Sequence, residues 1–177
     1  MKNNVLLEKS IRSIPDFPKP GILFRDVTTL IQNKAAFKKS VDLLAKKYKG
    51  KGFDKVVGVE ARGFIFAAAV AHKIGAGFVP VRKKGKLPFK TISATYALEY
   101  GTDTLEIHQD AICPGEKILI IDDLLATGGT VKAVIELVEK LQGKVAGIGF
   151  VIELLDLNGK DKFKEYPLYS LVKFEGE

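Results

Sequence analysis

Residues 117–130 read KILIIDDLLATGGT, and this stretch decides the fold expected for the chain. Its first part, 117–121, is apolar and rich in β-branched residues, which is typical of a strand buried in a parallel sheet. Asp122 and Asp123 are expected in the turn that follows this strand. A helix is predicted from Gly129 to Leu141, because apolar residues recur there at helical spacing. A strand, an acidic and glycine-rich turn and a helix in this order indicate an α/β fold.

The same order of elements occurs upstream. Residues 55–59 and 78–81 are predicted strands, and the alanine-rich run 64–74 between them is a predicted helix. This spacing indicates a βαβ unit with parallel strands and a right-handed crossover. Further predictions are a helix at 35–49, strands at 145–152 and 168–174, and an antiparallel hairpin at 91–110, where apolar and polar residues alternate. We therefore expect one central, mainly parallel sheet flanked by helices.

Composition restricts the class of protein. The chain has 177 residues, 46% of them hydrophobic and 28% charged, with a net charge of +7, as expected for a single globular domain over 1–177. One cysteine and two histidines exclude a disulfide framework, a multi-cysteine zinc or iron–sulfur site and a His-rich metal centre. No apolar run approaches the ~20 residues of a transmembrane helix, and residues 1–20 lack the layout of a signal peptide. We therefore expect a cytoplasmic protein with no membrane partner.

The turn after residue 121 is the strongest candidate ligand site. Glycines allow close approach of the backbone to a ligand, and the start of a helix favours an anion. Thr127 and Thr130 add hydroxyl donors. Asp122 and Asp123 would repel a phosphate, so they should face sugar hydroxyls, to which an ionised carboxylate can only accept hydrogen bonds. The pattern predicts a ribose 5-phosphate site; an acidic loop without a ligand is the alternative.

Two other features of the sequence concern ligand binding. The chain contains no GxxxxGK[ST] loop, and neither of its G-x-G pairs, at 75–77 and 147–149, continues as a dinucleotide fingerprint. The basic run RKKGK at 82–86 is expected in a loop after an apolar strand. It is either a solvated basic loop or a site for a phosphorylated small molecule.

The run DDLLATGGT at 122–130 is similar to the phosphoribosyl-pyrophosphate (PRPP) motif of the type I phosphoribosyltransferase family. FPKPGILFRD at 17–26, EARGF at 60–64 and the stretch from Arg82 through LEYG at 98–101 resemble the adenine-specific members of that family. The resemblance implies the type I fold with a flexible β-hairpin lid at about 83–110 and a small N-terminal hood at about 1–33. It also implies transfer of the phosphoribosyl group of PRPP to adenine, giving AMP and pyrophosphate in purine salvage, with Mg²⁺ as cofactor and a homodimer as the assembly.

The resemblance assigns roles to residues at matching positions. It implies that Mg²⁺ is held mainly by PRPP and water, with Asp122 as the one side chain that could join them. Glu99 and Arg62 are the expected catalytic residues, Glu99 through proton handling at adenine, and Tyr100 is expected to close the lid. The expected ribose-phosphate ligands are Asp122, Asp123, Ala126, Thr127, Gly128, Gly129 and Thr130; the pyrophosphate ligands are Ala61, Arg62, Arg82, Lys83 and Lys86; and the adenine contacts are Leu23, Phe24 and Arg25.

Several alternatives stay open at this point. Glu99 is either a proton-transfer group, a group that positions adenine or an exposed hairpin acid. Another purine or orotate phosphoribosyltransferase would share the PRPP half of the chain, although the segment at 17–26 favours adenine. A PRPP-sensing regulator that binds nucleic acid would suit the net charge of +7. Such regulators usually carry an added nucleic-acid module, and we expect no nucleic-acid partner here.

Overall fold

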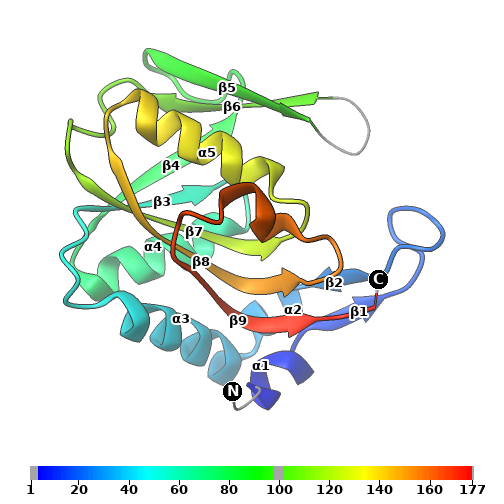
Figure 1. Ribbon diagram of the computed structural model, residues 1–177. Helices are drawn as coiled ribbons and strands as arrows, with labels where there is room; N and C mark the ends of the chain where they lie inside the picture. Colours follow the sequence, from blue (N-terminus) through cyan, green and yellow to red (C-terminus); the bar gives the residue numbers. More distant parts are fainter. Residues whose placement is uncertain (1–3, 98–101, 177) are drawn as a thin grey trace.

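The computed structural model describes residues 4–97 and 102–176. Within these ranges the central sheet has seven strands in the order β5-β6-β4-β3-β7-β8-β9. β3 pairs in parallel with β4 and β7, and the parallel ladder continues from β7 to β8 and β9. β6 pairs antiparallel with β4 and β5. The predicted α/β fold is confirmed (Figure 1). The strands are β3 (Lys55–Val59), β4 (Gly77–Lys83), β5 (Thr91–Ala97), β6 (Thr102–His108), β7 (Lys117–Leu125), β8 (Lys144–Leu154) and β9 (Leu168–Phe174).

Helices cover both faces of the sheet. α3 (Lys34–Tyr48) and α4 (Gly63–Ile74) lie on one face and α5 (Gly129–Lys140) on the other, as Figure 1 shows. Each face has its own apolar core, with Phe66 in one and Phe150 in the other. Burial on both faces explains the near-continuous apolar run at the start of β7. In the described ranges no helix has the length and apolar character needed to cross a membrane.

Local sequence signals fix the helices next to the sheet. The Asn33 side chain caps α3 by accepting from the backbone N–H groups of Ala35 and Ala36, each at 3.0 Å. Gly75 caps the C-terminus of α4, and its φ of 77° lies in the left-handed region. A Cβ at Gly58 of β3 would lie 2.6 Å from Cβ of Ala67, so this glycine lets α4 pack directly on the sheet.

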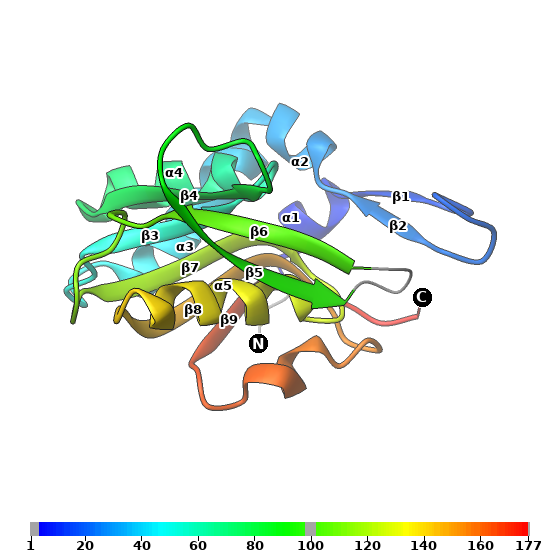
Figure 2. The same cartoon turned by 90° about the horizontal axis from the view of Figure 1, so that it is seen from above.

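The N-terminal part forms a separate small unit of α1 (Val5–Lys9), β1 (Arg12–Ile14), β2 (Phe24–Asp26) and α2 (Thr28–Gln32). β1 and β2 pair antiparallel. Hydrogen bonds from Thr28 and Arg12 lower the pKa of Asp26 to about 2, so its carboxylate ties both strands to α2. The β1–β2 ribbon and the β5–β6 hairpin project from the same side of the molecule (Figure 2).

Three strands are longer than the sequence predicted; one of them, β8, runs from Lys144 to Leu154, where 145–152 was predicted. β7 continues to Leu125, so Asp122 and Asp123 lie in the strand and not in the turn after it. The reason is the backbone ladder to β8, which continues past the apolar run and pairs Leu125 with Glu153. β4 likewise includes Arg82 and Lys83, which pair with β6 and were expected in a loop.

Candidate active site

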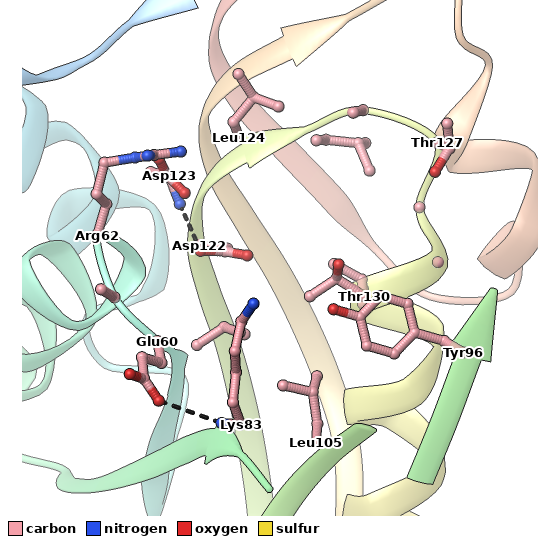
Figure 3. Close-up of a pocket in the computed structure, with 17 residues that line it drawn as sticks. Glu60, Arg62, Lys83, Tyr96, Leu105, Asp122, Asp123, Leu124, Thr127 and Thr130 are labelled. Atoms are coloured by element: carbon pink, nitrogen blue, oxygen red, sulfur yellow. Dashed lines mark hydrogen bonds and ion pairs between the residues drawn. The ribbon is translucent and has the colours of Figure 1, made fainter. Parts of the chain in front are cut away.

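A cavity of about 280 Å³ opens at the carboxyl ends of β3, β4 and β7, where open parallel sheets bind ligands (Figure 3). It brings together many of the residues that the sequence singled out. These are Ala61, Arg62, Lys83, Asp122, Asp123, Ala126, Thr127, Gly128, Gly129 and Thr130.

One side of the cavity is the loop between β7 and α5. Gly128 occupies the N-cap position of α5 with φ 77° and ψ 2°, a left-handed conformation that favours glycine. No described side chain caps this helix, so the first N–H groups of α5 remain available to a ligand. Thr127 and Thr130 line the cavity beside them. This side is suited to an anion without the help of a charged side chain.

Two adjacent carboxylates form the floor of the cavity. Asp122 and Asp123 are only 7% and 8% exposed. The Arg62 Nε donates to Oδ2 of Asp123 at 2.5 Å, and the Asp123 N–H donates to Oδ1 of Asp122 at 2.9 Å (Figure 3). Burial and, next, the neighbouring Asp123 charge raise the pKa of Asp122 well above its ordinary value. A Cβ at Gly63 would lie 2.3 Å from Oδ1 of Asp122, so the start of α4 packs directly against this carboxylate.

The opposite side of the cavity is basic and is organised by Glu60. Its Oε2 accepts from Arg82 Nε at 3.3 Å and from the Lys83 backbone N–H at 3.2 Å. Its Oε1 pairs with the Lys86 ammonium. The pKa of Glu60 is lowered to about 2, mainly by the hydrogen bond from Lys86 and next by the one from Arg82. Glu106 supports the same turn, accepting from the Gly85 N–H at 2.9 Å.

The basic residues therefore divide into two groups. Lys83 lines the cavity, and Figure 3 shows its side chain extending into it, while its ammonium pairs with Asp103 at 3.1 Å. Arg82 and Lys86 do not belong to the lining; they lie behind it, held by Glu60. Each of these three cations already has a carboxylate partner in its own chain.

Sequence reasoning missed Glu60 and Tyr96, which both line the cavity. Glu60 follows β3 directly at the carboxyl edge of the sheet, and this position was a signal that could have identified it. Tyr96 belongs to the alternating strand β5, and its hydroxyl lies 3.5 Å from Oδ2 of Asp103. The alternation of apolar and polar residues in this segment indicated which face of the hairpin Tyr96 lies on, but not that it borders the cavity.

The predicted adenine contacts lie in the N-terminal unit, outside the cavity lining. Phe24 and Arg25 belong to β2, and Leu23 precedes them. The guanidinium of Arg62 lies 5.9 Å from the centre of the Phe24 ring and so connects this unit to the cavity. Arg25 donates to Ser13 Oγ at 2.6 Å. Glu99 and Tyr100 lie outside the described residues.

Comparisons with known proteins agree with this geometry. The profile of the phosphoribosyl transferase domain matches residues 26–176. An adenine phosphoribosyltransferase from Escherichia coli O157:H7 (strain EC4115) is 58% identical, over 96% of this chain and 94% of the relative. A crystal structure of the enzyme of that name from Thermoanaerobacter pseudethanolicus has a TM-score of 0.93 at 51% identity, covering 96% of this chain and 99% of that one. Another, from Saccharomyces cerevisiae with an imino-altritol bisphosphate and adenine, has a TM-score of 0.89 at 40% identity, covering 95% and 97%.

Proposed function

This chain belongs to the phosphoribosyl transferase family, among its adenine phosphoribosyltransferases, and from that premise we propose how its residues carry out the reaction. The enzyme transfers the 5-phosphoribosyl group of PRPP to adenine and gives AMP and pyrophosphate, a step of purine salvage. One observation carries the assignment of roles. Two buried carboxylates lie between an uncharged loop at a helix start and a basic strand end, in a single cavity.

The loop at residues 126–130 binds the 5′-phosphate. Its support is the open N-terminus of α5, the left-handed Gly128 and the hydroxyls of Thr127 and Thr130 beside it. Backbone N–H groups at the start of a helix stabilise an anion by hydrogen bonds and by the helix dipole. Ala126 and Gly129 add no bulk, so a phosphate can approach the backbone closely.

Asp122 and Asp123 accept hydrogen bonds from the ribose hydroxyls. They lie near the end of β7, shortly before the phosphate loop, and line the same cavity as that loop. In the transition state, which resembles an oxocarbenium ion, the ribose carries a developing positive charge. Two fixed carboxylates in a buried site stabilise that charge, and it in turn favours the ionised form of Asp122.

Pyrophosphate binds at the opposite side of the cavity. Arg62 and the backbone of Ala61 follow β3, and Lys83 ends β4, so all three border the space next to the carboxylates. Arg82 and Lys86 lie one layer behind, on Glu60. Negative charge accumulates on the leaving group, and fixed cations and N–H donors stabilise it. Arg62 also neutralises Asp123 and so connects the ribose and pyrophosphate ends.

The donor set of the cavity fits a Mg²⁺ ion that arrives with its substrate. Among the described residues, no group of three or more His, Cys, Asp or Glu side chains is arranged to hold a metal ion. Arg62 holds Oδ2 of Asp123 and neutralises its charge, which leaves Asp122 as the carboxylate that could ligate. Mg²⁺ usually keeps several waters and binds through one or two carboxylates plus substrate phosphates. When bound, it neutralises charge on the departing pyrophosphate.

Adenine binds under the N-terminal hood, against Leu23, Phe24 and Arg25. The contact of Arg62 with the Phe24 ring supports a base site under this unit, next to the ribose carboxylates. The attacking nitrogen must approach the anomeric carbon from the face opposite to the departing pyrophosphate. Apolar side chains sandwich the ring, and backbone N–H and C=O groups read its edge. Glu99 takes up the proton that adenine loses or positions the base, and Tyr100 closes the lid over the ribose and excludes water.

The active assembly is a homodimer. Its support is an apolar surface on α4 and β4, where Ile65 is 40% and Phe78 is 37% exposed and the Phe64 and Phe78 rings lie 5.7 Å apart. Sedimentation of Phe78→Glu beside the wild-type chain tests this assembly. A dimeric wild type and a monomeric variant are expected, and a monomeric wild type would contradict the proposal.

We place the enzyme in the cytoplasm. The chain has one cysteine, Cys113, which is free and exposed and cannot form a disulfide within the chain. A protein without internal disulfides suits a reducing compartment.

The test of the function is product formation from PRPP and Mg²⁺ with adenine, hypoxanthine, guanine, xanthine and orotate supplied separately. We expect AMP from adenine and no nucleotide from the other bases. Turnover of a different base would keep the PRPP site and refute the assignment of the hood. PRPP binding without turnover of any base would favour a PRPP-sensing regulator, which a mobility shift with nucleic acid at about 0.2 M salt would then test.

A further inference from the structure

The loop at residues 126–129 is supported from behind by backbone. A Cβ built on Gly159 would lie 2.0 Å from the carbonyl oxygen of Ala126 and 2.9 Å from the N atom of Gly128. In the other direction, a Cβ on Gly128 would lie 2.3 Å from the carbonyl oxygen of Gly159. Gly159 begins the 3₁₀ helix η1 (Gly159–Phe163) in the connection between β8 and β9. Two loops that are distant in sequence therefore touch through glycines on both sides.

The two glycines are required for different reasons. Gly128 has φ 77°, which by itself favours glycine. Gly159 is outside the left-handed region, so its backbone would accept any L residue. Position 159 requires glycine only because there is no room for a side chain. Alanine at 159 therefore introduces a steric conflict with the loop and no conformational strain of its own.

The β8–β9 connection is anchored and cannot yield easily. Phe163 is 1% exposed and packs in the core beneath α5, and its ring atom Cε1 would lie 3.1 Å from a Cβ on Gly128. The Tyr166 hydroxyl donates to Glu139 of α5. The Leu155 N–H donates to the Phe174 carbonyl at 2.9 Å. A methyl group at 159 would therefore displace the loop in preference to the connection.

We propose that Gly159 is a positioning residue for phosphoribosyl transfer, because it sets the place of the backbone N–H groups that receive the 5′-phosphate. The proposal rests on the proposed function, in which this loop is the phosphate site. Contacts shorter than 3.0 Å are essentially absent for real Cβ atoms, so alanine at 159 must move the Ala126 carbonyl by about 1 Å. Converging N–H donors lose their common target at such a displacement.

Calorimetric titration of Gly159→Ala with ribose 5-phosphate and with pyrophosphate tests the proposal. We expect the Kd for ribose 5-phosphate to rise about tenfold or more, and the Kd for pyrophosphate to change less than about twofold. A general loss of structure would weaken both ligands. The matched control is Gly77→Ala, where a Cβ would be in ordinary contact at 3.4 Å from Lys55 Cγ, and both affinities should stay at the wild-type values.

A folded Gly159→Ala variant with wild-type affinity for ribose 5-phosphate would overturn the positioning role. Thr130→Ala separates this failure from failure of the proposed phosphate site. If Thr130→Ala weakens ribose 5-phosphate and Gly159→Ala does not, only the positioning role is wrong; if Thr130→Ala has no effect, the phosphate site itself is wrong.

Phe163→Leu takes the place of Gly159→Ala if the latter does not fold. The smaller side chain leaves the loop less well supported, so the Kd for ribose 5-phosphate should rise about twofold to fivefold and the Kd for pyrophosphate should not change. An unchanged Kd for ribose 5-phosphate in the folded Phe163→Leu variant would overturn the proposal in that case.

Discussion

In the proposed function, the two ends of the cavity recognise anions with different chemistry. At residues 126–130 the donors are backbone N–H groups and threonine hydroxyls, held in place by packing against Gly159. At the basic end the donors are cations, and each is paired with a carboxylate of the same chain: Arg62 with Asp123, Lys83 with Asp103, and Arg82 and Lys86 with Glu60. The first end is ready for its ligand, whereas the second must exchange partners when a ligand arrives.

This difference matches what happens to the two ligands in the reaction. The 5′-phosphate is present in both PRPP and AMP, so its site holds the same group before and after the chemical step and releases it only when AMP leaves. Pyrophosphate must leave, and the ion pair between Glu60 and Lys86 can form again as it departs. In the proposed function, internal carboxylates lower the affinity of the basic end for pyrophosphate and promote its release.

The largest effect is expected at the carboxylates between the two ends. Asp122→Asn combined with Asp123→Asn should weaken PRPP binding by at least about a hundredfold, because hydrogen bonds to charged groups contribute about 1.5–3 kcal/mol each. Equilibrium binding of PRPP with Mg²⁺ measures this change, and circular dichroism reports whether the variant is folded. A folded double variant with near-normal PRPP affinity would remove the carboxylates from the ribose site.

Replacing Asp122 by asparagine should weaken binding but stabilise the fold relative to the wild type as pH rises. The pKa of Asp122 is raised in the folded state, so the folded protein binds this proton more tightly than the unfolded chain. The stability of the wild type therefore falls as pH rises from the ordinary value of 3.8 through the raised value, whereas asparagine does not titrate. Thermal unfolding should show that the stability of Asp122→Asn, relative to that of the wild type, increases as pH rises from 4 to 8. A relative stability of the variant that falls over this range would contradict a raised pKa of Asp122.

A smaller effect is expected at the basic end. Glu60→Gln removes the charge that holds Arg82 and Lys86, and these cations then become available to pyrophosphate. The Kd for pyrophosphate should fall by about threefold to tenfold at low salt, and the Kd for ribose 5-phosphate should not change. Isothermal titration with each ligand measures the difference.

The pH dependence provides a control for Glu60. Its pKa of about 2 keeps the carboxylate ionised throughout neutral pH, so titration of Glu60 itself should add no pH dependence to the gain in the glutamine variant between pH 6 and pH 8. Weaker pyrophosphate binding by Glu60→Gln would show that Glu60 acts by ordering the basic turn and not by competing with the ligand.

The smallest effect is expected at Tyr96, on the edge of the cavity between the two ends. Its hydroxyl makes a contact of 3.5 Å with Asp103, too long to contribute much. Tyr96→Phe should change KM for PRPP and kcat by less than about threefold. Steady-state kinetics would contradict this if kcat fell tenfold or more.

The sequence predicted the strands of the central sheet and the helices that cover it, because burial on both faces of a parallel sheet leaves a strong apolar pattern. The resemblance assigned residues 122–130, Ala61 and Arg62 to ligand binding, and the structure brings them together at the carboxyl edge of the parallel strands. The length of β7 was underestimated, because hydrogen bonding to β8 continues past Asp122 without an apolar signal. Backbone ladders are independent of side-chain type.

Contacts between distant loops could not be predicted in the same way. The hold of Glu60 on Lys86 depends on the register of β4 with β6 and on the turn at Gly85. The approach of Gly159 to Ala126 joins loops that follow different strands. Neither contact leaves a periodic pattern or a local motif in the sequence, so only the folded structure reveals them.

The most direct measurement of the two-ended cavity is a crossed titration. Ribose 5-phosphate and pyrophosphate are each titrated into the wild type, Thr130→Ala and Lys83→Met. The account predicts that Thr130→Ala weakens only ribose 5-phosphate and that Lys83→Met weakens only pyrophosphate, each by about tenfold. If both variants weaken the same ligand, or each weakens both equally, the division of the cavity into two anion sites is wrong.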